Sequence, residues 1–422
     1  PGASAQSPRP MCVDGLGNML LVPIQQARPG MTLAMPVMHP HRPDTALLRP
    51  GFVLDDETLA RLHDLRQPEL WIRYPGLEVV EKYVSPRIMR RRGIVAARVK
   101  EIVASFAHDA HAPLPFGRYA DTIRGFVEAI YENTTAAVMI QNMAESDAIL
   151  SRHASDVCFL SLLLGMRLDE YLIAERHRVS GRRAKSIVGI GLGAMVADVG
   201  MLELSPEELH AWTERGGDDR DPVWRTHVLL GHARVREGIG PAPAAAVLHH
   251  HQRFDGTGYP EAASDPSSGE LRPLRGHEIH VFARIVGAAD LLQRLRRPMT
   301  GGRGMPTVRA LAALIRGPEA SWVDPVVRDA LIAAVPAFAP GSMVRLSTGD
   351  RAVVVGWDPA STCRPTVRIL PERIERGRVE DEEIDLRRAR SITIVEAEGV
   401  DVSGDQFDPR EAQSAGSDAA AA

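Results

Sequence analysis

The sequence predicts a mainly α-helical protein, with a small α/β module before the helices and a small β-rich extension after them. Two observations support this fold class. Through the middle of the chain, apolar residues recur at helical spacing, at Ile123, Phe126, Val127 and Ile130 and again at Val157, Leu160, Leu164 and Leu168. Near the C-terminus, apolar runs of strand length flank a turn at Thr348-Gly349-Asp350. A chain of 422 residues has room for about two or three domains.

Composition excludes several functional classes. The net charge of −4 does not favour a general DNA-backbone binder. The three cysteines, Cys12, Cys158 and Cys363, are far apart, so neither a disulfide framework nor a thiolate zinc cluster is indicated. No apolar run approaches the length of a membrane span, and residues 1–10 lack the features of a secretory leader. We therefore expect a cytoplasmic protein.

Changes in composition along the chain predict its domain organisation. In the α/β module, residues 51–65 form a helix with Asp55 or Asp56 as its N-cap, and a strand follows at 70–73. A run of arginines, Arg90 to Arg92, is interpreted as a solvated helix face, and a helical segment is expected at 138–148. The expected divisions are 1–18, a disordered lead; 19–84, the α/β module; 85–118, a helical linker; 119–335, a helical domain; 336–400, a β extension; and 401–422, a disordered tail.

A run of three histidines, 249–251, leads into a loop that contains two glycines, a tyrosine and a proline. Adjacent side chains diverge by about 100° on a helix. Two neighbouring histidines can therefore reach one ion only at a frayed helix end, or where two ions lie side by side. A solvated surface run or a tag remnant is the alternative, but the internal position argues against a tag. Gly256, Gly258 and Pro260 indicate a loop of defined shape.

Two acidic residues stand alone in apolar segments. Asp198 lies within 187–204, and Asp290 lies in the middle of 279–295. A carboxylate is rarely buried unless it is paired, capped or bound to a metal. Histidines on separate helices complete a set that is typical of an Fe, Mn or Zn site in a helical scaffold. The set is His153, Asp198, His227, His250, His251 and Asp290.

Two glycine-containing stretches are interpreted as structural. Gly189, Gly191 and Gly193 have the spacing of a nucleotide loop, but no strand precedes them, so they are expected to permit close helix packing. Residues 216–219 superficially resemble the GGDEF hairpin of cyclic di-GMP synthases. No alternating strands flank them, so a turn is expected.

Residues from about 120 to 335 resemble the HD-GYP family, bacterial members of the HD phosphohydrolase superfamily that hydrolyse cyclic di-GMP. The family's central block, HHERxDGxGYP, is matched at 250–260, and its other blocks are matched in order at 153–157, 227–231 and 283–290. The resemblance implies an all-helical HD-type metal phosphohydrolase core, with a small N-terminal α/β module and a small C-terminal β-barrel-like extension. It also implies that substrate is bound by Arg253, Asp255, Gly256, Gly258, Tyr259 and Pro260.

The chain departs from the family at positions that carry the chemistry. Ala197 occupies the place of the histidine in the defining His-Asp pair, and Met201 that of the following lysine. Gln252 replaces a glutamate and Gln293 an aspartate. The resemblance implies one metal held by His153, the missing histidine and Asp290, and a second held by His227, His250 and His251. Asp198 would bridge the two metals. The second set is complete and the first lacks a ligand, which favours one ion or a weakly bound pair.

Three functions remain open at this stage. The first is a signalling protein that binds cyclic di-GMP, a related phosphodiester or a partner, with weakened or lost hydrolysis. The second is an active cyclic di-GMP phosphodiesterase that uses the complete metal site, and the third is a hydrolase of another phosphate ester. The absence of the histidine and lysine favours the first. The partners considered are GGDEF-type proteins, through the GYP loop, and a second copy of the chain.

Overall fold

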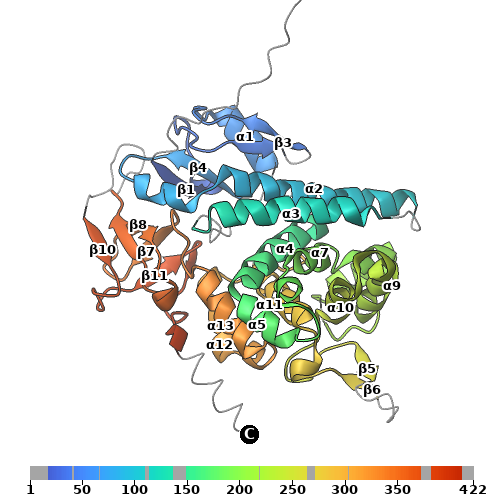
Figure 1. Cartoon of the computed structure of the whole chain (residues 1–422). Helices are drawn as coiled ribbons and strands as arrows, with labels where there is room; N and C mark the ends of the chain where they lie inside the picture. Colours follow the sequence, from blue (N-terminus) through green and yellow to red (C-terminus); the bar gives the residue numbers. More distant parts are fainter. Residues whose placement is uncertain are drawn as a thin grey trace, which may run out of the picture.

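A computed structural model describes residues 18–39, 42–65, 67–109, 114–135, 149–217, 219–263, 271–302, 304–371 and 382–410. The helix expected at 138–148 lies outside the described residues, as do 1–17 and 411–422. The protein is mainly helical, as predicted, with small β elements near both ends of the chain (Figure 1).

The N-terminal module is built on two pairs of antiparallel strands. Strand β1 (Met19–Pro23) pairs with β4 (Glu69–Arg73), and β2 (Val37–His39) pairs with β3 (Arg42–Leu48). Helix α1 (Asp56–Asp64) begins after Asp55, whose carboxylate accepts a hydrogen bond from the Thr58 amide at 2.7 Å. That bond satisfies one of the free amides at the helix start. The remaining elements are the short helices η1 (Ile24–Gln26) and η2 (Glu78–Tyr83).

Two long helices lie between the N-terminal module and the other helices. Helices α2 (Pro86–His108) and α3 (Phe116–Glu132) pack along each other, and α2 also contacts α4 (Ile149–Arg167) (Figure 1). Arg92 of α2 is only 2% exposed. It pairs with Asp156 of α4 at 2.6 Å and lies over the Phe159 ring. The solvated face predicted for the arginine run is therefore wrong at Arg92, because this side chain fixes α2 to the core.

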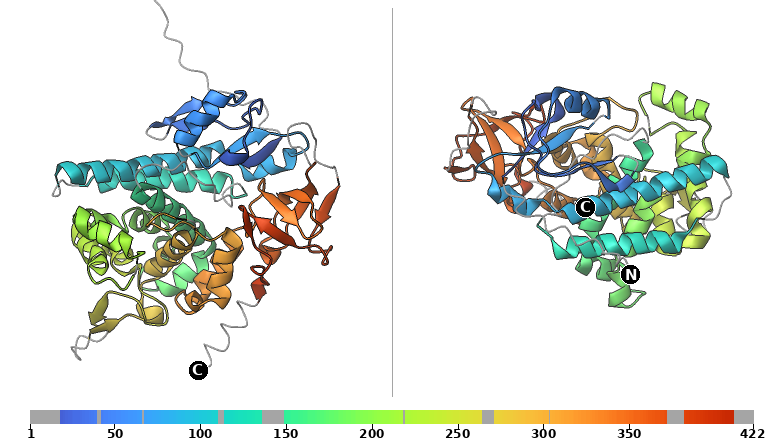
Figure 2. Two further views of the ribbon diagram at one scale, coloured as in Figure 1. Left: turned by 180° about the vertical axis from the view of Figure 1, so that it is seen from behind. Right: turned by 90° about the horizontal axis from the view of Figure 1, so that it is seen from above.

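The helical domain surrounds α4, whose residues from Ser151 to Gly165 are almost all buried. The elements that pack around it include α7 (Val188–Met195), α11 (Val281–Arg296) and α13 (Pro325–Ala334). Figure 2 shows these helices below α2 and α3 in its left view. The remaining elements are α5 (Asp169–Glu175), α6 (Gly181–Ala184), η4 (Val199–Glu203), α8 (Pro206–Glu214), η5 (Trp224–Thr226), α9 (His227–Ile239), α10 (Pro241–His249), β5 (Glu261–Ala263), β6 (Leu271–Pro273), η6 (Gly276–Glu278), α12 (Thr307–Arg316) and η7 (Pro318–Ser321).

The glycines of α7 permit close packing, as the sequence indicated. A Cβ at Gly191 would lie 2.8 Å from side-chain atoms of Ile123 and Leu162, and a Cβ at Gly193 would lie 3.0 Å from Ala246. Two segments, 149–167 and 181–203, are long and apolar enough to cross a membrane, which the sequence analysis did not anticipate. Their most apolar windows are 78% and 72% buried inside the protein, so packing in the helical core accounts for their composition.

The C-terminal extension is an open six-stranded sheet rather than the barrel-like unit that was expected. Its strand order is β10-β9-β8-β7-β11-β12, and in the described part of the chain the two edge strands do not pair with each other. Residues expected in the disordered tail continue this unit, since Val402 and Phe407 are buried. The strands are β7 (Met343–Leu346), β8 (Arg351–Gly356), β9 (Thr366–Ile369), β10 (Glu383–Asp385), β11 (Ile394–Ala397) and β12 (Val400–Asp401), with η8 (Pro359–Ser361) between β8 and β9.

The two β parts share one hydrophobic core although they lie at opposite ends of the sequence. Val353 and Val355 of β8 pack in the same cluster as Leu20 and Trp71 of the N-terminal module. The Leu21 amide also donates a hydrogen bond to the carbonyl oxygen of Gly341 at 3.0 Å. The N-terminal module is therefore held against the C-terminal sheet as well as against α2.

A close approach of two backbones sets the spacing between η4 and α9. A Cβ at Gly200 would lie 1.9 Å from the His227 carbonyl oxygen and 2.5 Å from the Gly231 amide nitrogen. Only glycine leaves room for this contact, because the atoms in the way are backbone atoms that cannot rotate aside. The contact joins the segment that follows Asp198 to the helix that begins at His227.

We expect Gly200→Ala to lower the free energy of unfolding by about 1–3 kcal/mol, because the added methyl group forces η4 away from α9. Equilibrium urea denaturation would measure the change. The matched control is Gly117→Ala on α3, where an added Cβ meets nothing within 4 Å. Equal stability of the two variants would contradict the close contact.

Candidate metal centre

Six buried side chains gather between the helices of the core, in two groups that share Asp198. In each group the candidate ligand atoms all lie within 4.8 Å of one another. The shared carboxylate is 3.6 Å from His227 Nε2 and 3.4 Å from His250 Nε2 through Oδ1, and 3.6 Å from His153 Nε2 through Oδ2. The first group is Asp198, His227, His250 and His251, and the second is His153, Asp198 and Asp290.

Each of these side chains comes from a helix or a helix end. Asp198 lies between α7 and η4, and His227 is the first residue of α9. His250 and His251 follow the last residue of α10, where the helix has ended. The divergence of about 100° between adjacent side chains of a helix therefore does not apply to them. Their two rings lie in the same group, with centroids 4.1 Å apart. His153 comes from α4 and Asp290 from α11.

Backbone carbonyl groups orient two of the histidines. His227 Nδ1 lies 2.6 Å from the Trp224 carbonyl oxygen, and His250 Nδ1 lies 2.9 Å from that of Val247. A carbonyl oxygen only accepts hydrogen bonds, so each Nδ1 must carry a proton, and each Nε2 presents a lone pair when the ring is neutral. This is the arrangement that orients a metal-binding histidine.

The first group fits a divalent metal ion. The Nε2 atoms of His227, His250 and His251 are buried and have no hydrogen-bond partner among the described residues. An unpaired buried nitrogen costs free energy unless something else satisfies it. Three such nitrogens beside the buried carboxylate of Asp198 make a three-nitrogen, one-oxygen donor set, which suits Zn, Mn or Fe.

The protonation states of three members of this group suit a metal as well; burial would lower the pKa of His250, but the neighbouring Asp198 raises it overall. Burial lowers the pKa of His227 to about 4, against the opposing charge of Asp198. Burial also holds the pKa of His251 well below its usual value, and His250 adds to the effect. Burial alone would raise the pKa of the Asp198 carboxyl, but the surrounding histidines, His250 first, hold it below its usual range. Neutral imidazoles and an ionised carboxylate are the forms that bind metals.

The second group is different because its polar atoms already have partners within the protein. His153 Nε2 lies 2.8 Å from Asp290 Oδ1, and Arg294 Nε donates to Asp290 Oδ2 at 2.8 Å. Ala197, at the position where the family has its histidine, is buried and supplies no donor atom. The second group therefore offers fewer free metal-donor atoms than the first. The guanidinium of Arg294 already balances the charge of Asp290.

The GYP loop, 252–260, packs against the first group. Tyr259 is buried, and its ring stacks on His251 with centroids 4.8 Å apart. The Tyr259–Pro260 peptide bond is cis. A Cβ at Gly258 would lie 2.3 Å from the Arg253 amide nitrogen, so the loop crosses itself closely at this glycine. Asp255 accepts hydrogen bonds from the amide and the hydroxyl group of Thr257. These contacts give the loop its shape.

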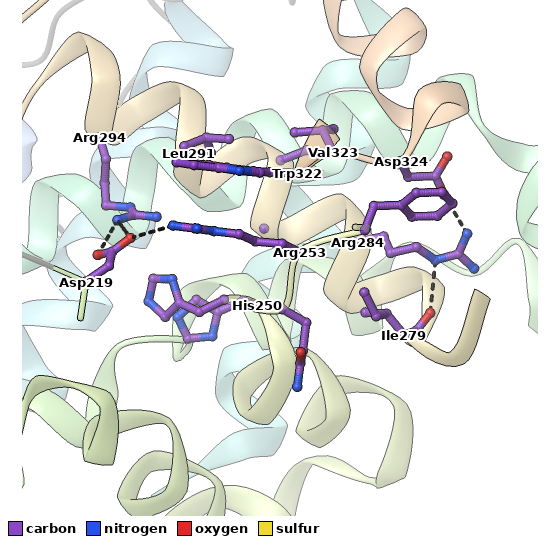
Figure 3. A pocket seen from close by; sticks show the side chains of 15 residues that line it. Asp219, His250, Arg253, Ile279, Arg284, Leu291, Arg294, Trp322, Val323 and Asp324 are labelled. Atoms are coloured by element: carbon purple, nitrogen blue, oxygen red, sulfur yellow. Dashed lines mark hydrogen bonds and ion pairs between the residues drawn. The ribbon is translucent and has the colours of Figure 1, made fainter. Parts of the chain in front are cut away.

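Arg253 lines a pocket beside the first group, together with Gln252 and Phe254 of the same loop. Figure 3 shows its guanidinium lying flat against the Trp322 ring, with His250 on its other side. The guanidinium carbon is 3.5 Å from the centre of the Trp322 ring. Asp219 and Arg294 line the same pocket. Sequence reasoning missed these last two residues and Trp322, although the spacing of Arg294 four residues after Asp290 is a signal for an ion pair on a helix face.

Two family models match this chain. The model described as "HD domain" covers residues 193–327, and the one described as "KOW domain associated with HD domain" covers residues 343–400. The first match contains five of the six clustered residues, all but His153, and the whole GYP loop. The second coincides with the C-terminal sheet.

Two known proteins with related sequences are bacterial phosphodiesterases. A cyclic di-GMP phosphodiesterase of Pseudomonas aeruginosa is 24% identical over 377 residues, which cover 81% of this chain and 83% of that protein. A 3′3′-cGAMP-specific phosphodiesterase of Vibrio cholerae is 24% identical over 253 residues, covering 58% of this chain. The match spans 45% of that second relative, so less than half of its length is represented.

A solved structure of an HDG"Y"P protein from Bdellovibrio bacteriovorus covers 74% of this chain and 98% of its own, with 18% identity and a TM-score of 0.42. The HD-domain match, the related phosphodiesterases and the GYP loop agree with the motifs found in the sequence. Residues 193–327 therefore match the HD domain, and the chain resembles proteins of the HD-GYP type, with Ala197 at the place of the histidine of the HD pair.

Proposed function

We propose that this protein binds cyclic di-GMP or a related cyclic dinucleotide at a centre with one complete metal site, and that its hydrolytic activity is weakened or lost. The observation that supports this best is the difference between the two groups. The first has three unpaired imidazole nitrogens beside Asp198. In the second, Ala197 removes a donor and Asp290 is already paired with His153 and Arg294.

The protein's own residues would act mainly by binding and orienting. Asp198, His227, His250 and His251 would hold the ion, with the carbonyl groups behind His227 and His250 fixing two of the rings. When bound, such an ion lowers the pKa of a water molecule and neutralises charge on a phosphodiester. Met201 cannot supply the cation that a lysine would offer to a phosphate oxygen, which removes one source of transition-state stabilisation.

The nature of the ligand is inferred from the relatives. Both act on cyclic dinucleotides by their names, one on cyclic di-GMP and the other on 3′3′-cGAMP. An active phosphodiesterase that works with the first group alone is the second candidate function. The completeness of that donor set favours it.

Partner binding is a further part of the proposal. At the tip of the GYP loop, Asp255 and Thr257 are exposed, so GGDEF-type proteins would have access to them. The cytoplasmic location expected from the sequence remains a prediction, as does a homodimer.

We expect the purified protein to carry about one divalent ion per chain, and His227→Ala to weaken binding of that ion by about tenfold or more, because one of the four donors is lost. Metal analysis after dialysis against buffered Zn or Mn would measure both. The matched control is His210→Ala, which removes an exposed histidine from α8. Equal metal content in the His227 and His210 variants would contradict the assignment of the first group.

We expect Ala197→His combined with Met201→Lys to raise cyclic di-GMP hydrolysis by at least about tenfold, because a missing ligand and a missing cation are both restored. Product formation and metal content should be measured together, with thermal unfolding to confirm that the buried substitutions are tolerated. A folded double variant with unchanged metal content and turnover would show that these two positions do not correspond to the family's histidine and lysine.

A further inference from the structure

Two arginines converge on one carboxylate at the pocket beside the metal centre. Arg294 Nη1 donates to both oxygens of Asp219 at 2.8 Å, and Arg253 Nη2 lies 3.8 Å from Asp219 Oδ2. Figure 3 shows the three side chains together at one side of the pocket. They come from separate parts of the chain, since Asp219 lies between α8 and η5, Arg253 lies in the GYP loop and Arg294 lies in α11.

The guanidinium of Arg253 has donors to spare. A guanidinium has five N–H groups. Within the described part of the chain, no hydrogen bond is made by the Arg253 side chain, and its one ion-pair partner, Asp219, is too distant for a direct hydrogen bond. Stacking on Trp322 holds the group in place without using those donors. Such a preoriented, unsatisfied guanidinium suits an oxyanion ligand.

The charges of Arg253 and Arg294 are balanced by neighbouring carboxylates while Asp219 is present. Arg253 and Arg294 contribute two positive charges, and Asp219 and Asp290 contribute two negative ones. The side chains of Asp219, Arg253 and Arg294 are 19%, 25% and 21% exposed, so solvent and small anions can reach them. A loss of the Asp219 charge would leave one positive charge without compensation beside the metal centre.

We propose that Arg253 and Arg294 form a binding site for a phosphate group, and that Asp219 occupies this site as an internal competitor. A carboxylate and a phosphate present similar oxygen geometry to a guanidinium. The backbone of Asp219 is fixed beside the arginines, because the main-chain carbonyl oxygen of this residue accepts a hydrogen bond from Arg225 Nε at 2.8 Å. The phosphodiester must displace this carboxylate from the arginines to bind. The inference rests on the proposed function, since it assumes that a phosphodiester enters this pocket.

The test compares binding of inorganic phosphate by the full-length wild-type protein and by Asp219→Asn, using isothermal titration calorimetry at low salt. We expect the variant to bind phosphate about tenfold more tightly, because its arginines no longer face an internal anion. Adding Arg253→Gln or Arg294→Gln to Asp219→Asn should abolish the gain. Metal content should be determined for each variant, because Arg294 also contacts Asp290. The matched control is Glu214→Gln, which removes the same charge from an exposed position on α8.

Unchanged or weaker phosphate binding by Asp219→Asn overturns the inference, as does an equal gain from Glu214→Gln. Titration of the wild-type protein with cyclic di-GMP separates this inference from the proposed function. Cyclic di-GMP binding without any effect of Asp219 on phosphate affinity refutes the internal competitor alone. A gain in phosphate affinity for Asp219→Asn without any cyclic di-GMP binding supports the arginine site and refutes the proposed ligand.

Discussion

The buried carboxylate of Asp198 is the group on which the rest of the site depends. An ionised side chain that is 4% exposed is strongly destabilising unless neighbouring groups compensate its charge. His227 and His250 face one of its oxygens and His153 faces the other. These partners come from three different helices, so the packing of α4, α9 and α10 around the segment after α7 places the imidazoles that, together with a bound cation, would compensate the buried charge.

The glycine contact between η4 and α9 shows how tightly this arrangement is specified. Gly200 brings the segment after Asp198 against the carbonyl group of His227, and that residue's ring then turns back toward the carboxylate. The carbonyl group of Trp224 fixes the same ring from behind. The position of this candidate ligand is therefore determined by backbone contacts on two sides. Such positioning is what a metal-binding histidine requires if its lone pair is to point at a common centre.

Much of this could be predicted from the sequence, because the main signals are local. The helix 307–316 and the N-cap of α13 follow from proline, glycine and aspartate at the helix ends. Adjacent histidines at a helix end, and isolated acids in apolar segments, pointed to a metal site. The burial of Arg92 could not be predicted in this way. Its burial depends on Asp156, which lies 64 residues further along the chain, and only the tertiary structure brings the two together.

Asp219 and Arg294 were missed for the same reason, because their contact joins residues that are far apart in the sequence. This contact also affects the charge balance of the centre. Asp219 follows two glycines in what looks like an ordinary turn, and nothing local indicates that two arginines meet there. Arg294 joins that turn to the metal centre, because it donates to Asp219 through Nη1 and to Asp290 through Nε. In the half of the centre that lacks a histidine, one carboxylate is thus balanced by a cation that belongs to the chain and does not dissociate. The alanine at the place of the family histidine and this arginine are complementary, since Arg294 already supplies Asp290 with the positive charge that a second ion would bring.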